Sequence, residues 1–389
     1  MKATILFLLI TFLPVLSFAD TDKEISKDNQ KINKPKIELV FALDTTGSMS
    51  SLIAAAKDKI WSIANTMATA KPAPEIKIGI VGYRDRGDSY ITTITEMTDD
   101  LDQVYQKLME YRAVGGGDHP ESVNQALYDA VHKNKWSTDK AKTYKVIFLV
   151  GDAPPHMDYK DDVKYKVTCA EALKKGIVIN TIQCGTLSGT KQVWKRIAYL
   201  ANGQYFRVAH GGDSKDYKTP YDNEIAKKSR ELHETKVYYG DRKFHLMNKK
   251  KLDAVKDIYS KAKTSSIAKR SSYNMSGSGK KNLMGSQEIV DSVSNGKIKI
   301  EDIKSKELPP VMQKMTLKER KEYIEKKNKK RKKLYSELKE LNKKRQTHIL
   351  RIVKKEKDKG KNSLDMKIYK SIKKQAAEKE IMYKEELQY

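Results

Sequence analysis

The chain has 389 residues and a formal net charge of +27, and this length is enough for two or three domains. Beyond the N-terminal stretch no apolar run reaches the roughly 20 residues that cross a bilayer, so the composition excludes a transmembrane segment in the mature protein. The charge is uneven: residues 1–212 carry 28 basic and 24 acidic side chains, whereas residues 213–389 carry 49 and 26. Two regions of different character therefore meet near residue 212.

Residues 1–19 have the pattern of a secretory signal peptide. The apolar run Ile5–Ile10 follows a basic residue, and Ser17 and Ala19 place small side chains at the −3 and −1 positions of a cleavage site. The residue directly after that site is Asp20 and not a cysteine, which argues against a bacterial lipid anchor. We therefore expect an exported protein of bacterial type, soluble in the periplasm or outside the cell, with residues 20–35 as an N-terminal linker.

Between residues 36 and 240 strand and helix patterns alternate. The strand candidates are near-continuous apolar runs, typical of a sheet covered by helices on both faces: residues 37–43, 76–83, 90–96, 146–150, 177–183 and 204–208. The helix candidates are residues 51–69, 101–111, 121–133, 162–174, 191–200 and 224–233. The pattern predicts an α/β domain with a doubly wound, mostly parallel six-stranded sheet. The second and third strand candidates, residues 76–83 and 90–96, lie close in sequence, so we expect a hairpin there and one antiparallel edge strand.

Residues 241–310 show weak periodicity and predict an irregular linker with short helices. Within them, Ser271–Ser278 is rich in Ser and Gly and is typical of a flexible loop.

Residues 311–389 predict a basic helical region with two long helices. The first begins with the capping-box pattern Thr316–Glu319 and extends to Lys359, and the second covers residues 364–387. An apolar seam along the first helix favours a coiled coil, but the seam is interrupted by two polar residues. Its members are Leu334, Leu338 and Leu341, and the interruptions are Arg345 and His348.

The basic tail has two interpretations. The run Lys326–Lys333 could bind an anionic envelope surface, and the export signal makes nucleic acid an unlikely partner. Alternatively, the interspersed glutamates indicate a helix whose charged faces are simply solvated.

Cys169 and Cys184 are the two cysteines of the chain. The first lies early in a predicted helix and the second ends the strand that follows. A helix running back along its own strand brings these ends together, so a disulfide is one reading and two buried free thiols are the other.

Oxygen-bearing side chains follow two of the predicted strands. Asp44 ends the first strand and is followed by Thr46 and Ser48, while Asp152 comes directly after the strand at 146–150. In open α/β sheets ligands sit beyond the carboxyl ends of the strands. A third loop, Gly115–Glu121, adds acids at a helix N-terminus. Hard oxygen donors of this kind suit Mg²⁺ or Mn²⁺, although Asp44 and Asp152 could also act only as helix caps.

At these residues the chain resembles von Willebrand factor type A domains with a metal-ion-dependent adhesion site. The Asp-x-Thr-Gly-Ser pattern at 44–48 is theirs. The loops at 118–121, Asp-His-Pro-Glu, and 151–153, Gly-Asp-Ala, are similar to the Asp-x-Pro-Glu and Thr-Asp-Ala loops of the integrin β-subunit I-like domain. The resemblance covers about half of the chain and agrees in the order of its three loops.

The resemblance implies a set of metal ligands. Thr46, Ser48 and Glu121 would bind a divalent cation directly, and Asp44 and Asp152 would bind through water or support the direct ligands. The cation is expected to be Mg²⁺, with Mn²⁺ or Ca²⁺ as alternatives. A second cation site would use Asp118 with Glu121. The third integrin site has no counterpart, because serines stand at residues 50 and 51.

The implied function is adhesion: the cation accepts an Asp or Glu carboxylate from a protein partner in an open position. The alternative is a structural, charge-driven envelope protein whose basic tail binds anionic surfaces and whose metal site is vestigial. No zinc-protease motif, nucleophile elbow or paired nucleophile and base is found in the sequence, so we do not expect an enzyme.

Overall fold

The structure, a computed structural model, describes residues 34–51, 53–117, 119–208, 217–355 and 363–383. The predicted signal peptide and almost all of the N-terminal linker lie outside these ranges. Among the helices within them, none combines the length and the hydropathy that a membrane crossing requires.

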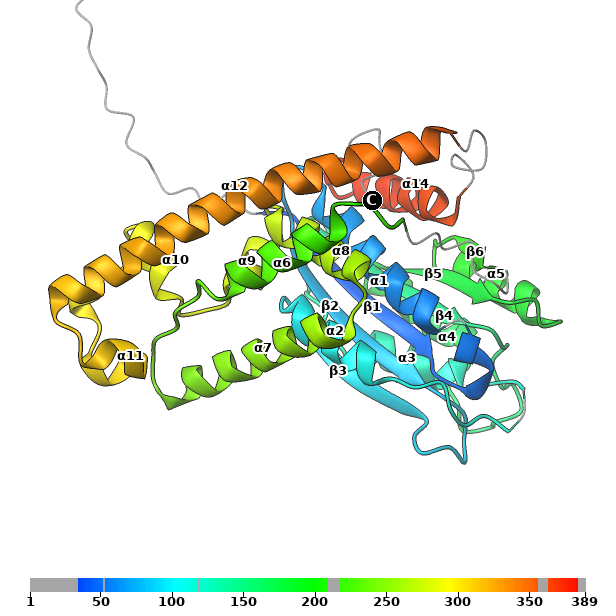
Figure 1. The fold of residues 1–389 in the computed structure, drawn as a ribbon. Coiled ribbons are helices and arrows are strands. Elements are labelled where there is room, and N and C mark those ends of the chain that lie inside the picture. The colour runs from blue at the N-terminus through cyan, green and yellow to red at the C-terminus, as the bar shows by residue number, and fades with distance from the viewer. Residues whose placement is uncertain (1–33, 52, 118, 209–216, 356–362, 384–389) are drawn as a thin grey trace, which may run out of the picture. The chain divides into compact units, whose positions relative to one another are not determined.

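A six-stranded sheet forms the centre of the domain, in the order β3-β2-β1-β4-β5-β6 (Figure 1). Neighbouring strands run parallel, except for β3, which pairs antiparallel with β2 at the edge. The predicted fold class is thus confirmed. The strands are β1 (Lys36–Asp44), β2 (Glu75–Tyr83), β3 (Thr92–Thr98), β4 (Thr143–Gly151), β5 (Ile177–Cys184) and β6 (Tyr205–Val208).

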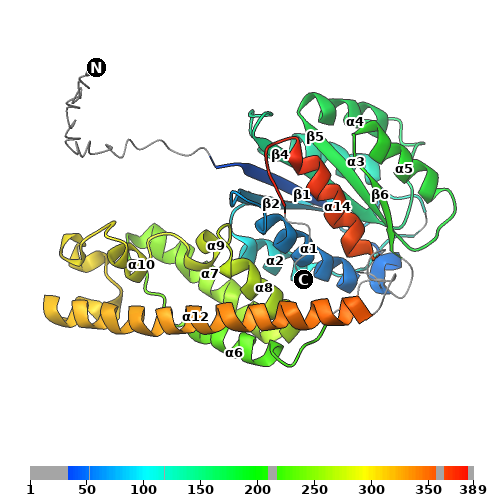
Figure 2. The same ribbon diagram turned by 90° about the horizontal axis from the view of Figure 1, so that it is seen from above.

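Helices cover both faces of the sheet, which explains why its strands are apolar on both sides. In β1, Leu39 and Phe41 belong to the core on one face, whereas Val40 and Ala42 belong to the core on the other. The first face is covered by α1 (Ile53–Ala68), α2 (Leu101–Glu110) and α14 (Leu364–Ala377), and the second by α3 (Val123–His132), α4 (Tyr165–Lys174) and α5 (Thr190–Leu200) (Figure 2).

Further helices connect β6 to α14. Within the described residues they are α6 (Asp222–His233), α7 (Arg242–Lys261), α8 (Thr264–Met275), α9 (Lys280–Met284), α10 (Ile289–Ser294), α11 (Pro310–Gln313) and α12 (Leu317–Lys355). The short 3₁₀ turns η2 (Ile300–Asp302) and η3 (Ser305–Glu307) lie between α10 and α11, and a third, η1 (Gly47–Ser51), follows β1. The longest, α12, contacts α6, α8 and α10 (Figure 1).

The expectation of an irregular linker with short helices over residues 241–310 is wrong in its first half, because α7 has 20 residues and α8 has 12. In its second half the short helices α9 and α10 and two 3₁₀ turns agree with it. The expected loop at Ser271–Ser278 is wrong in its first half, since Ser271 and Tyr273 are buried within α8. This helix is buried on nearly all sides, so its sequence lacks the one-sided apolar stripe by which a surface helix is recognised.

The capping box of α12 is confirmed. The Thr316 amide and hydroxyl donate to Glu319 Oε2 at 2.7 and 2.8 Å, and the Glu319 amide donates to Thr316 Oγ1 at 3.3 Å. The apolar seam packs on helices of the same chain. Arg345 is buried in the same stripe, and its charge is compensated there because its guanidinium donates to Asp222 Oδ1 at 3.0 Å.

Buried ion pairs join the helices after β6 to the sheet domain. Arg270 of α8 donates to both oxygens of Asp102 in α2, at 2.6 and 2.7 Å. Burial alone would raise the pKa of Asp102, but Arg270 outweighs it and holds that pKa well below its usual value. Lys251 of α7 lies 2.8 Å from Asp100 at the start of α2. The charged groups therefore fix the helical region against one edge of the domain.

The last described helix, α14, packs into the sheet core. Ile368 and Ile372 share a hydrophobic cluster with Phe41 and Trp61, and Lys59 of α1 pairs with Asp365. The helix ends at Ala377, earlier than the expected residue 387, and the segment after it continues along the domain, since the Lys71 amide donates to the Met382 carbonyl.

Candidate metal-ion site

The carboxyl ends of β1 and β4 bring the first two loops together. These strands are adjacent and parallel, so Asp44, at the end of β1, and Asp152, just after β4, emerge at the same edge of the sheet. The third loop is fixed to the first by backbone hydrogen bonds: the Gly47 amide donates to the Gly115 carbonyl at 2.9 Å, and the Val114 amide to the Thr45 carbonyl at 3.2 Å.

Four predicted ligands form a continuous chain of close oxygen contacts. Asp44 Oδ1 accepts from the Thr46 amide at 2.9 Å and from the Thr46 hydroxyl at 2.7 Å. The Thr46 and Ser48 hydroxyl oxygens lie 3.0 Å apart, and the Ser48 hydroxyl donates to Asp152 Oδ1 at 3.1 Å. Asp44 and Thr46 are fully buried. The structure thus places these side chains around one point at the end of β1.

Glu121 lies beside this chain and is fully buried. Its loop is fixed by hydrogen bonds from the Glu121 amide to the Pro154 carbonyl and from the His156 amide to the Glu121 carbonyl, both 3.0 Å. A Cβ atom added at Gly116 would lie 3.2 Å from Thr46 Cβ and 3.4 Å from Glu121 Oε1, and φ at this glycine is +76°. Glycine is needed here both for the backbone conformation and for the close approach of Thr46 and Glu121.

The acids at the site repel one another in a buried setting. Burial raises the pKa of Glu121 to about 9, and the charges of Asp44, Asp85 and Asp152 add to the effect. Burial, followed by the Asp152 charge, raises the pKa of Asp44 to about 7. Asp44 Oδ2 and both Glu121 carboxylate oxygens have no hydrogen-bond partner among the described residues. Such groups need either a proton or a cation, and a divalent ion fits this donor set.

Tyr83 and Gly151 lie beside the site, and the sequence did not predict that they support it. A Cβ atom added at Gly151 would collide with the buried hydroxyl of Tyr83, at the end of β2, and would lie 2.8 Å from Asp44 Cβ. Burial and then the charge of Asp44 raise the pKa of Tyr83 well above its usual value. The Gly151 backbone is therefore pressed between Tyr83 and Asp44. The alignment of β1, β2 and β4 could have indicated this crowding.

Asp85 and His156 support the Glu121 loop. His156 Nε2 lies 3.2 Å from Asp85 Oδ2, and its Nδ1 lies 2.8 Å from Asp158 Oδ1. The Ser122 hydroxyl donates to Asp85 Oδ1 at 2.8 Å. The residue after Glu121 and the loop after Asp152 are therefore linked through one buried carboxylate and one imidazole.

The second cation site stays a prediction, since Asp118 lies outside the described residues. His119, next to it, places Nδ1 3.9 Å from Glu121 Oε1. Among the described residues no group of three or more acids, histidines and cysteines is arranged as a metal cage by itself. A cation at Asp44 would therefore depend on the Thr46 and Ser48 hydroxyls and on water.

The possible disulfide is not formed: Cys169 and Cys184 are free, buried thiols. Cys184 belongs to the core on the α1 face of the sheet, whereas Cys169 belongs to the core on the opposite face. Side chains alternate between the two faces along a strand, and Cys184 points to the face opposite α4. The expected pairing considered the ends of the helix and the strand but not this alternation. Burial raises the pKa of Cys169 to about 12 and that of Cys184 further.

Comparison with known proteins agrees with this architecture. Residues 38–214 match the family described as von Willebrand factor A domain. The von Willebrand factor A domain-containing protein 7 of Rattus norvegicus is 36% identical over 121 residues, which make up 31% of this chain and 12% of that protein. The alpha-protein kinase vwkA of Dictyostelium discoideum is 25% identical over 146 residues, 35% of this chain and 23% of that protein. The chain thus spans less than a quarter of the length of these two curated relatives.

Among solved structures, the SpRpn10 VWA domain is similar with 16% sequence identity and a TM-score of 0.36, over 45% of this chain and 89% of that one. The sequence match over residues 38–214 agrees with the strand order and with the loops at the carboxyl ends of β1 and β4, so this part of the chain matches the von Willebrand factor A domain family.

Proposed function

We propose that this domain binds a divalent cation, preferentially Mg²⁺, through Asp44, Thr46, Ser48, Glu121 and Asp152, and uses it to bind a protein partner that offers an Asp or Glu side chain. We further propose that the protein acts outside the cytoplasm after removal of residues 1–19. A protein-interaction role is typical of an A domain, while the cation dependence is the part that the site itself must support.

One observation carries the proposal. Asp44 and Glu121 are buried carboxyl groups with oxygens that no described residue satisfies, and both have raised pKa values. Buried acids without partners are costly, so they are expected where a positive ligand compensates them.

The neutral hydroxyls explain how the site would favour a partner. Thr46 and Ser48 supply oxygen without adding charge, so fewer negative charges surround the ion than in a site made of carboxylates alone. When bound, the cation supplies a Lewis-acidic position that an anionic oxygen can occupy. Asp44 would orient Thr46 by accepting a hydrogen bond from its hydroxyl, and Asp152 would do the same for Ser48.

The test is titration of the full chain with Mn²⁺, followed by water-proton relaxation. We expect saturable binding of one ion with exchangeable water. Thr46→Val removes one donor oxygen and should weaken binding at least about tenfold. Thr45→Val is the matched control, because the Thr45 hydroxyl donates to the Tyr83 carbonyl at 2.9 Å. It should leave Mn²⁺ affinity within about threefold of the wild type.

The partner carboxylate is tested by adding a short peptide with a single glutamate, and the same peptide with glutamine. The glutamate peptide should lower the relaxation enhancement by displacing water, and the glutamine peptide should not. Absence of saturable Mn²⁺ binding would refute the cation site and would favour the alternative of a structural, charge-driven protein with a vestigial site.

We also propose that the domain binds without catalysis. The site hydroxyls contact carboxylates, and so do the two described imidazoles near Glu121: His119 Nδ1 lies 3.9 Å from Glu121 Oε1, and His156 is held between Asp85 and Asp158. These contacts provide no paired nucleophile and base at the site. A metal-dependent hydrolytic activity that is lost with Thr46→Val would overturn this proposal.

A further inference from the structure

A row of cationic side chains runs along an exposed face of α12. Lys339, Lys343 and Arg351 are exposed, and Thr347 occupies the remaining position of the row. Residues four apart share a helix face, so neighbouring positions are separated by about 6 Å and the row extends over about 18 Å. The positive charge is therefore arranged in a line.

The fold does not use the charge of this row. The buried arginines of α12 are paired, Arg331 with Glu288 at 2.8 Å and Arg345 with Asp222 at 3.0 Å. By contrast, the three cations of the row have no carboxylate at ion-pair distance within the described ranges. The row is thus available to an external anion.

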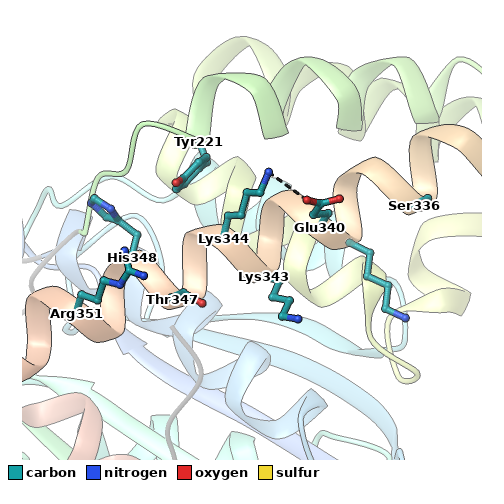
Figure 3. Close-up of a pocket in the computed structure, with 9 residues that line it drawn as sticks. Tyr221, Ser336, Glu340, Lys343, Lys344, Thr347, His348 and Arg351 are labelled. Carbon is teal, nitrogen blue, oxygen red and sulfur yellow. Dashed lines mark ion pairs between the residues drawn. The ribbon is translucent and has the colours of Figure 1, made fainter.

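Two hollows flank the row. One, of about 600 Å³, lies between α12 and Tyr221 (Figure 3), and the other, of about 530 Å³, is bordered by residues of α1 and α8. The two hollows share Lys339, Lys343 and Thr347, so the row lies between them. Glu340 is the single acid among their lining residues, and Lys344 pairs with it at 3.1 Å, as Figure 3 shows.

Other lining side chains carry hydroxyl or amide groups, among them Ser336 in the first hollow and Asn65, Thr69 and Ser272 in the second. Two of these hydroxyls already donate within the chain, Thr69 to the Thr66 carbonyl and Ser272 to Asn342 Oδ1. Hydroxyl and amide groups beside lysines are the usual contacts to phosphate oxygens. Lysine binds phosphate as a point charge and arginine binds it through two parallel hydrogen bonds, and the row contains two lysines and one arginine.

We propose that the row on α12 and its two hollows bind an extended, flexible polyanion that carries phosphate groups along a single chain. A linear ligand matches the linear spacing of the cations. Recessed walls favour a chain over a flat lipid surface, because a membrane cannot enter the hollows. This site is separate from the proposed cation site and does not depend on it.

The test measures fluorescence anisotropy of end-labelled inorganic polyphosphate with the full chain, in chelator so that a bound cation cannot bridge to phosphate. We expect saturable binding. If three cations contact the chain, the affinity should fall about twentyfold when salt is raised from about 50 to about 200 mM.

Two triple variants with the same loss of charge decide where the ligand binds. Lys339→Gln, Lys343→Gln and Arg351→Gln together should weaken binding at least about tenfold and flatten the salt dependence. The control replaces three exposed lysines of α12 that do not line the hollows, Lys326, Lys330 and Lys333, with glutamine. It should change the affinity less than about twofold.

Four results would overturn the proposal. They are equal weakening by both triple variants, equal affinity for polyglutamate, tighter binding to phosphatidylglycerol vesicles than to polyphosphate, and no saturable binding at the lower salt. The first indicates diffuse attraction to the whole helix, and the second and third indicate a carboxylate chain and a membrane surface.

Discussion

Replacement of Glu121 by glutamine tests the crowding of buried acids directly. With chelator present, Glu121 keeps its proton in the folded protein up to a pKa of about 9, while the unfolded chain releases it near the ordinary value of 4.5. At pH 7, which lies about 2.5 pH units above the unfolded pKa, keeping this proton costs the folded state about 3 kcal/mol. Glu121→Gln should therefore raise the free energy of unfolding of the cation-free protein by about that amount.

The sign of the pH dependence follows from the raised pKa. At pH values between the unfolded and folded pKa of Glu121, the native state binds more protons than the unfolded chain. The stability that depends on Glu121 is therefore fully present below pH 4.5 and is lost as the pH rises toward about 9. From pH 5 to pH 8 the loss should approach about 4 kcal/mol in the wild type. Glu121→Gln should remove most of this slope, leaving the contribution of Asp44.

The assay is urea unfolding followed by circular dichroism, in chelator and in saturating Mg²⁺. A ligand present at about 1,000 times its dissociation constant stabilises the native state by about 4.1 kcal/mol. This exceeds the gap of about 3 kcal/mol at pH 7, so the order of stability at that pH should reverse when Mg²⁺ is added. Glu110→Gln, on an acid whose side chain is 55% exposed, is the control and should change little in either condition. A Glu121→Gln protein no more stable than the wild type in chelator at pH 8 would refute the reasoning.

Three other predictions follow from particular contacts. Gly116→Ala places a Cβ at φ +76° and should weaken Mn²⁺ binding at least about tenfold, measured by relaxation titration; unchanged affinity would contradict the role of this glycine. Arg270→Met removes both hydrogen bonds that the buried Asp102 carboxylate accepts from Arg270 and leaves it Lys251 at 3.8 Å, so it should destabilise the protein by about 3 kcal/mol at pH 7, with a smaller penalty in acid; an equal penalty at pH 3 and pH 7 in urea unfolding would contradict it. Cys169 and Cys184 should not react with a thiol reagent in the native protein, and both should react in denaturant without reductant. A lack of reaction in denaturant would indicate a disulfide.

The sheet was predictable from sequence because its strands are buried on both faces. In a strand such as β1, whose residues 37–44 are all buried, neither face needs polar side chains. The continuous apolar run in the sequence therefore marks both the position and the length of the strand. The short separation of β2 and β3 was enough to predict the antiparallel edge.

The errors arose where local sequence does not specify the surroundings. Burial of α8 on nearly all sides depends on α1 and α6, which come from other parts of the chain, so its serines resembled a loop. The direction of Cys184 depends on which face of β5 meets α4, and spacing alone cannot give it.

For the candidate site, the oxygen donors could be chosen from sequence because each follows a strand or opens a helix. Their supporting residues could not. Tyr83, Gly151 and Asp85 matter through contacts between β2, β1 and β4 and the loop after β4, and these contacts exist only once the strands are aligned.

The packing of α14 has a consequence for how this protein can be divided. Ile368 and Ile372 fill the same core as Phe41, although more than 300 positions separate them along the chain. A fragment cut after β6 would expose that apolar surface to water and would be expected to aggregate. The helices from α6 to α12 are therefore an insertion within one cooperative unit. Truncation from the C-terminus removes α14 first, so it should destabilise the sheet before it removes any of the helices from α6 to α12.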